Sequence, residues 1–96
     1  MMTDEKNLSL IAQYREHLEK LKAETVETDY DACCSPNRET ALNHLLSMLT
    51  KMEEFVREGR REKFFRWLGF LQGALWLLGE FSLNDLRDHN RPPANE

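Results

Sequence analysis

The sequence predicts an all-α protein, a small helical bundle with three main helices and a short C-terminal helix. Three segments repeat apolar residues at spacings of three and four, the period of an amphipathic helix. We find neither strand-like alternation nor an internal repeat. The 96 residues fit one domain. A domain of this size buries only about 60 to 65 per cent of its unfolded surface, so we expect a thin core that self-association would help to stabilise.

We expect the first helix over residues 4–25. Its apolar seam consists of Ile11, Tyr14, Leu18 and Leu21, and charged residues fill many of the other positions. Because this seam is only one side chain wide, we predict a peripheral helix that is not central to the core.

Residues 26–36 show no helical period. Their acidic, small and turn-forming side chains predict a linker. Its Ser35–Pro36 step predicts an N-cap followed by proline at the first helical position. Cys33 and Cys34 are adjacent, where a bridge would close a strained small ring. We therefore predict free thiols in a reducing compartment.

The helical core is expected over residues 37–91, beginning with a helix from about Asn37 to Arg57. Gly59 should end this second helix. Its wide apolar stripe predicts deep packing and consists of Leu42, Leu45, Leu46, Met48, Leu49, Met52, Phe55 and Val56.

A third helix, expected from about Arg61 to Glu80, carries two apolar faces. One holds Phe64, Leu68, Leu71, Leu75 and Leu78; the other holds Trp67, Phe70, Ala74, Leu77 and, beyond the helix, Phe81. An antiparallel second helix can cover one face, which leaves the other for the first helix, another subunit or a foreign partner.

Gly69 and Gly73 lie on one side of this third helix. Each costs up to about 1 kcal/mol of helix propensity relative to alanine, so we predict that another backbone approaches closely there.

A short fourth helix is expected from Leu83 to about His89. Ser82 and Asp85 have the spacing of a capping box, and Phe81 and Leu86 occupy the hydrophobic-staple positions. Residues 92–96 should form a disordered tail.

The net charge of −4 excludes a bulk nucleic-acid polycation and an acidic DNA mimic. The N-terminus lacks a basic start followed by a long apolar run, so we expect no secretory signal. The apolar run 67–79 is shorter than the roughly 20 residues of a membrane span. We therefore expect a cytoplasmic protein without a membrane partner.

A basic patch surrounds the second interhelix turn and predicts an alternative function, nucleic-acid binding. Its cations outnumber Glu58 and Glu62 by three and are Arg57, Arg60, Arg61, Lys63 and Arg66. The interspersed glutamates would repel a phosphate backbone and favour a solvated turn instead.

No constellation predicts catalysis, a metal or a cofactor. His17, His44 and His89 show no ligand spacing. Cys33 and Cys34 lie in an acidic segment that disfavours a thiolate. Glu53, Glu54 and Glu58 could form part of a carboxylate cluster for Mg²⁺. The third helix offers no second acidic pair to complete such a site, because Glu80 stands alone. We therefore predict a protein that is not an enzyme.

The third helix also carries the residue types that are enriched at interface hot spots. The predicted packing or partner surface consists of Arg66, Trp67, Phe70, Gln72, Gly73 and Trp76. Whether both tryptophans complete the core or contact a partner stays open at this point, because a homodimer permits both.

From Arg66 to Pro92 the sequence resembles a group of small proteins of tailed phages and prophages. The shared pattern is Arg-Trp-Leu-Gly-Phe, a Gln-Gly step, an apolar-Trp pair and a closing His-Asn-Arg. It is matched by Arg66, Trp67, Leu68, Gly69, Phe70, Gln72, Gly73, Leu75, Trp76, Gly79, Leu86, His89, Asn90 and Arg91. The range 41–56 is similar as well, whereas the first helix and the cysteine linker lie outside the resemblance.

The resemblance implies a setting of infection, where small accessory proteins act by binding a host protein, for instance as inhibitors. We therefore expect a non-enzymatic accessory protein that binds and modulates a host or phage protein, as a homodimer in the host cytoplasm. The alternative is a nucleic-acid-binding regulator that uses the basic patch.

Overall fold

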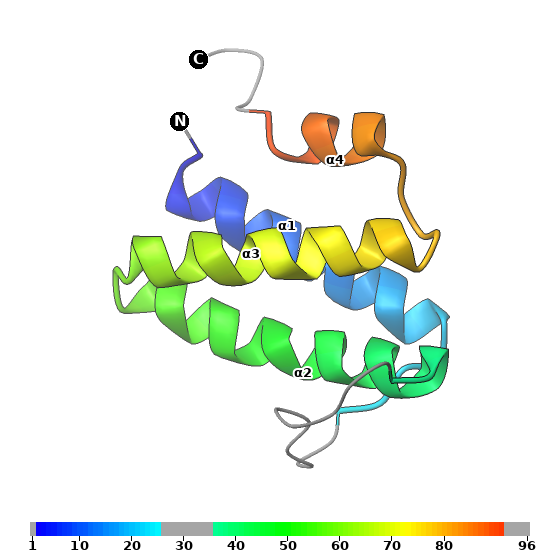
Figure 1. Ribbon diagram of the computed structural model, residues 1–96. Helices are drawn as coiled ribbons and strands as arrows, with labels where there is room; N and C mark the ends of the chain where they lie inside the picture. The colour runs from blue at the N-terminus through cyan, green and yellow to red at the C-terminus, as the bar shows by residue number, and fades with distance from the viewer. Residues whose placement is uncertain (1, 26–35, 92–96) are drawn as a thin grey trace.

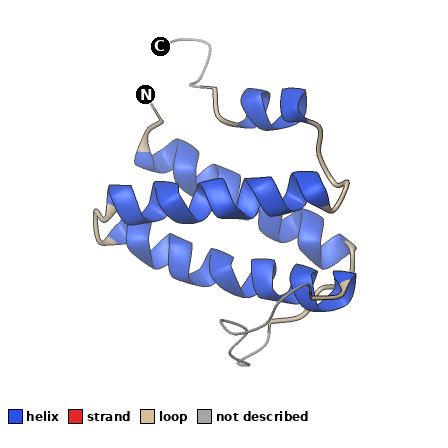
Figure 2. Cartoon of the chain, in the orientation of Figure 1, coloured by secondary structure: helices blue, strands red, loops and turns tan. Residues whose placement is uncertain are grey.

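The computed structural model describes residues 2–25 and 36–91, which form four α-helices and no strand (Figures 1 and 2). These are α1 (Asp4–Lys20), α2 (Arg38–Arg57), α3 (Arg61–Leu77) and α4 (Leu83–His89). The predicted all-α bundle, with three main helices and a short fourth one, is confirmed. The cysteines, most of the predicted linker and the predicted tail lie outside the described residues.

Side-chain caps start three of the four helices. The Thr3 hydroxyl accepts the Lys6 N–H at 3.1 Å, and the Asn37 amide oxygen accepts the Thr40 N–H at 2.8 Å. The predicted capping box is confirmed, because Ser82 and Asp85 exchange two bonds of 3.0 Å. The predicted cap of the second helix was wrong: Asn37 caps α2, and Pro36 precedes the cap.

The three main helices end alike, in a residue with positive φ. These are Lys22 at 64°, Gly59 at 73° and Gly79 at 78°. In each case the next N–H bonds back into the last turn, as Arg60 does to the Phe55 carbonyl at 2.8 Å. The predicted stop at Gly59 is confirmed. The first helix is shorter than predicted because the chain turns at Lys22, where no glycine signals an end.

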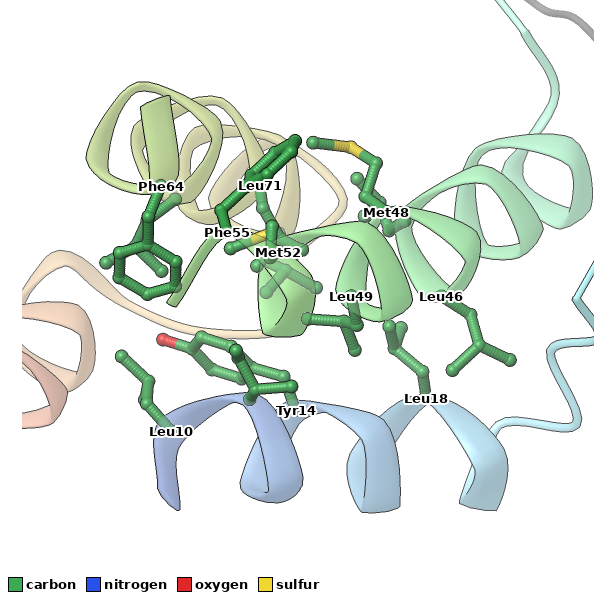
Figure 3. Close-up of a cluster of buried hydrophobic side chains, with 14 of the residues drawn as sticks. Leu10, Tyr14, Leu18, Leu46, Met48, Leu49, Met52, Phe55, Phe64 and Leu71 are labelled. Carbon is green, nitrogen blue, oxygen red and sulfur yellow. The ribbon is translucent and has the colours of Figure 1, made fainter. Parts of the chain in front are cut away.

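The core lies between α1, α2 and α3, and all eight predicted core residues of α2 are buried. Leu10, Tyr14 and Leu18 of α1 point towards α2 and α3 in Figure 3 and are at most 1% exposed. The prediction of a peripheral first helix was therefore wrong. Leu10 beside Ile11 doubles the width of the seam, while Leu21 lies beyond the helix and is partly exposed.

α3 buries Phe64, Leu68, Leu71 and Leu75 of its first predicted apolar face in the core. Of the second predicted face, Trp67 and Ala74 are partly buried against the core, whereas Phe70 and Leu77 are exposed. Within α4, by contrast, only Leu86 is buried. Figure 1 shows α4 beyond α1 and α3, on the side opposite α2. The outer side of α3 thus remains open to solvent.

Candidate interaction surface

The outer side of α3 exposes large apolar side chains. Leu77 is 78% exposed, Phe70 60%, Trp76 47% and Phe65 36%. At 3.6 residues per turn, Arg66, Phe70, Gly73 and Leu77 share one row along the helix, which we call the axial row. Phe65 and Trp76 lie together on the flank of this row. We call the axial row and this flank the α3 face.

Gly69 and Gly73 open onto this face. An ideal Cβ at either position would meet no atom within 4 Å. The predicted close approach of another backbone therefore does not occur within the described chain. Both glycines lower the helix propensity of α3, and no close packing within the described chain offsets this cost.

Two residues of the predicted packing or partner surface pack within the chain. Trp67 packs edge to face against Phe55, with ring centroids 5.0 Å apart, and Gln72 is 7% exposed. Arg66, Phe70, Gly73 and Trp76 remain on the surface. The two tryptophans thus divide, one against the core and one half exposed on the α3 face.

Gln72 holds three elements together through hydrogen bonds. Its Nε2 donates to the Tyr14 hydroxyl at 2.9 Å and to the Asn90 Oδ1 at 2.8 Å. Asn90 Nδ2 donates back to Gln72 Oε1 at 3.0 Å. α1, α3 and the end of α4 therefore meet at one buried amide.

Tyr14 continues this polar network to His89, whose Nδ1 lies 2.8 Å from the tyrosine hydroxyl. Burial raises the pKa of Tyr14 to about 12, although the Gln72 hydrogen bond opposes the shift. Partial burial also lowers the pKa of His89. Because Gln72 Nε2 already donates to the Tyr14 oxygen, we assign neutral His89 the tautomer in which Nδ1 accepts the Tyr14 hydroxyl proton and Nε2 carries the ring proton.

Residues of the pattern noted between Arg66 and Pro92 therefore dock α4. Gln72, His89 and Asn90 all belong to it, and the sequence predicts a contact role only for Gln72. The one sequence feature that could have indicated this contact was that the three residues belong to the same pattern. No local spacing relates residue 72 to residue 90. Phe81 completes the junction, with its ring centroid 4.6 Å from that of His17 and 4.9 Å from that of His89.

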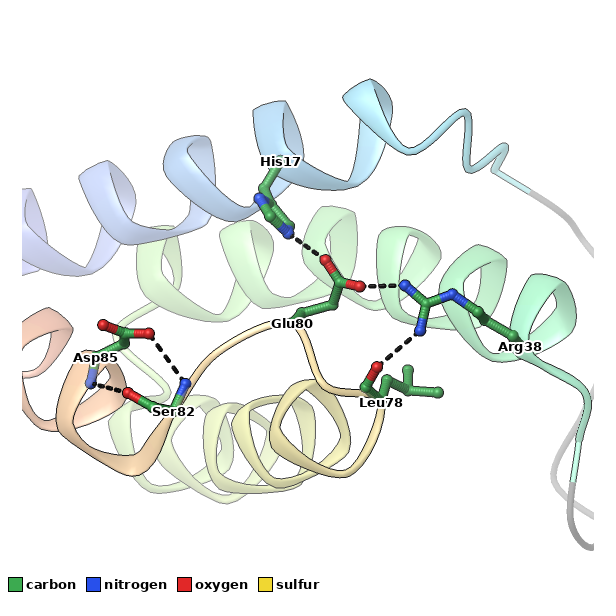
Figure 4. A network of polar contacts seen from close by, with 6 residues as sticks. All are labelled: His17, Arg38, Leu78, Glu80, Ser82 and Asp85. Atoms are coloured by element: carbon green, nitrogen blue, oxygen red, sulfur yellow. Dashed lines mark hydrogen bonds and ion pairs between the residues drawn. The ribbon is translucent and has the colours of Figure 1, made fainter.

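Glu80 forms a second polar junction, drawn in Figure 4. His17 Nε2 lies 2.7 Å from Glu80 Oε1, and Arg38 pairs with Oε2. Arg38 also donates to the Leu78 carbonyl at 2.7 Å. Partial burial raises the pKa of Glu80, but the hydrogen bonds from His17 and Arg38 outweigh it and hold that pKa below its usual range.

Four of the five cations of the predicted basic patch contact other groups of the chain at its surface. Arg57 donates to Glu53 at 2.7 Å, and Arg61 donates to Asp4 at 3.0 Å and to the Met2 carbonyl at 2.9 Å. Arg60 and Lys63 lie 5.2 and 4.9 Å from the centre of the Phe55 ring. Arg66 makes no ion pair with any residue that the structure describes.

Other chemistry finds little support in the described part of the chain. There, no group of three His, Cys, Asp or Glu side chains is placed to hold a metal ion. His17 and His89 belong to the two junctions, and the His44 ring lies edge-on to Phe70 at 6.4 Å. None of the described helices combines the length and the apolarity that crossing a bilayer requires.

Comparisons with protein-family models, curated proteins and solved structures gave no significant match. The residue roles described above therefore rest on contacts within this chain.

Proposed function

We propose that this chain is a non-enzymatic interaction protein that acts as a homodimer and binds and modulates another protein. The exposed α3 face carries the proposal. Its side chains Phe70, Trp76 and Leu77 are 47 to 78% exposed on one side of one helix. Clustered apolar exposure of this kind marks interaction sites more often than it marks free surface.

The resemblance to small phage and prophage proteins supports a host or phage protein as the partner. Trp76 is the anchor that we assign to that partner. Its indole is half exposed on the flank of the α3 face, and tryptophan is among the residues that dominate binding energy at interfaces.

A pull-down of tagged protein from nuclease-treated bacterial lysate tests the proposal, with wild type beside Trp76→Ala. Leu83→Ala is the matched control, because Leu83 is a half-exposed apolar residue on α4 rather than on α3. We expect a stoichiometric protein that Trp76→Ala loses and Leu83→Ala retains. With that protein purified, Trp76→Ala should weaken binding by about tenfold or more.

Recovery of the bait alone, or of the same proteins with all three chains, would contradict binding through Trp76. Nucleic-acid binding is a distinct outcome, recognised by an affinity that falls steeply with salt as counterions are released. The engagement of Arg57, Arg60, Arg61 and Lys63 within the fold gives this alternative less support.

A further inference from the structure

We infer that the axial row is the contact between two copies of this chain, with their α3 helices antiparallel. This rests on the proposed function, because it names the occupant of one part of the α3 face. The flank with Trp76 stays available for a foreign partner.

The spacing of the row is symmetric. Arg66, Phe70, Gly73 and Leu77 follow one another at intervals of four, three and four residues. A two-fold axis midway between positions 71 and 72 therefore places Phe70 opposite Gly73 of the second copy. The same axis places Arg66 opposite Leu77 at both ends of the contact. A closed two-fold dimer needs a surface that is its own complement in this way.

The shapes at these positions also match. The Phe70 side chain projects from the helix and is 60% exposed. At Gly73 the space that a Cβ would occupy is open. An aromatic ring can therefore lie directly on the helix backbone of the other copy, and symmetry makes this contact twice.

Charge selects the antiparallel orientation. Parallel α3 helices would set Arg66 beside Arg66 and the exposed Glu62 beside Glu62. Antiparallel helices separate these like charges and move each Arg66 next to Leu77, where the aliphatic part of its side chain can pack. Arg66 is free for this role, since no described residue forms an ion pair with it.

Sedimentation and light scattering of the purified full chain test the inference. We expect a mass that rises with concentration from the chain value of 11.4 kDa to twice that value. Phe70→Ala should raise the dimer dissociation constant about 30-fold, the loss typical of a hot spot. Gly73→Leu should remain monomeric, and Leu83→Ala should match wild type.

Misfolding should not imitate this result, because leucine favours a helix more than glycine does. Circular dichroism and thermal unfolding of Gly73→Leu check that its monomer is folded. A wild-type chain that stays monomeric at every concentration would overturn the inference. That outcome would also remove the homodimer from the proposed function, whereas the binding of a foreign protein through Trp76 would survive it if Trp76→Ala still lost that protein.

Cross-linking tests the orientation. Arg66→Cys and Leu77→Cys are made separately in a Cys33→Ser, Cys34→Ser chain and treated with a short bis-maleimide. The antiparallel contact predicts a strong cross-link only when the two variants are mixed. Cross-links within each variant alone, without gain on mixing, would indicate parallel helices and overturn the inference.

Discussion

The side-chain amide of Gln72 satisfies partners on two other segments, the Tyr14 hydroxyl and the Asn90 amide. We predict that Gln72→Leu lowers the free energy of unfolding by about 1 to 3 kcal/mol, because the Tyr14 oxygen loses its donor and the part-buried Asn90 amide loses both of its hydrogen bonds to Gln72. Urea denaturation measures the change. Gln13→Leu is the control at the exposed end of the same network, 3.4 Å from His89, and should cost at most about 0.5 kcal/mol. Equal costs would refute the role of the buried amide.

Tyr14 should keep its proton in strongly alkaline solution. Burial raises its pKa from 10.0 to about 12. Because the folded-state pKa is raised, the resulting stability is fully present below pH 10.0 and is lost as the pH rises through about 12. Phenolate absorbance in a Tyr30→Phe chain isolates this group. The folded chain should titrate well above the same chain in denaturant, and coincident curves would contradict the burial argument.

At the scale of elements, α4 is the one held mainly by polar contacts, since only Leu86 within it is buried. His89 is central to this docking. A second ring proton on His89 would give the Tyr14 hydroxyl two donors and leave the hydroxyl proton without its acceptor. Partial burial lowers the pKa of His89. Asp85 and Asp88 oppose that shift, whereas Lys6 and His17 add to it.

We therefore predict that α4 loosens on acidification. A depressed histidine pKa means that the stability is fully present above the unfolded value of 6.5 and is lost as the pH falls through the lower folded value. Amide-exchange protection factors in α4 should fall as the pH is lowered below 6.5, while those in α2 change less. His89→Gln, which cannot titrate, should weaken this dependence. The same slope in both chains would assign it to another group.

The sequence predicted the elements better than their long-range contacts. Period and cap chemistry located the α2 stripe, the Gly59 stop and the Ser82 capping box. Ser35 and Asn37 are both good cap residues, so composition alone could not choose between them. Lys22 carries no signal for positive φ. The Gln72–Tyr14 bond joins residues far apart in the chain, and no local period reports such a pair.

At the scale of the whole molecule, α3 both contributes to the core and exposes apolar side chains to solvent. Its composition suggested both roles but did not show which residues serve which role. Leu71 and Leu75 lie fully in the core, whereas Phe70 and Leu77 on the same helix face outward. The sequence correctly predicted two apolar faces. It could not predict that Trp67 and Ala74 of the second face would pack against the core while Phe70 and Leu77 stay exposed, because this depends on how the three helices pack.

Glu80 joins α1, α2 and the segment after α3 through His17, Arg38 and the neighbouring Leu78 carbonyl. We predict that Glu80→Gln lowers the free energy of unfolding by about 1 to 3 kcal/mol, because the Arg38 guanidinium and the His17 ring both lose a carboxylate acceptor. The depressed pKa of Glu80 contributes stability that is present above its usual value of 4.5 and is lost as the pH falls below it. Wild type should therefore lose more stability in acid than Glu80→Gln does.

Glu53→Gln is the matched control, since Glu53 likewise contacts two basic side chains, Arg15 and Arg57. Its side chain is 30% exposed, against 11% for Glu80, so solvent screens its ion pairs more strongly. We expect Glu53→Gln to cost less than about 1 kcal/mol in urea denaturation at neutral pH. An equal cost for the two substitutions would mean that the junction of three segments at Glu80 adds nothing beyond an ordinary surface ion pair.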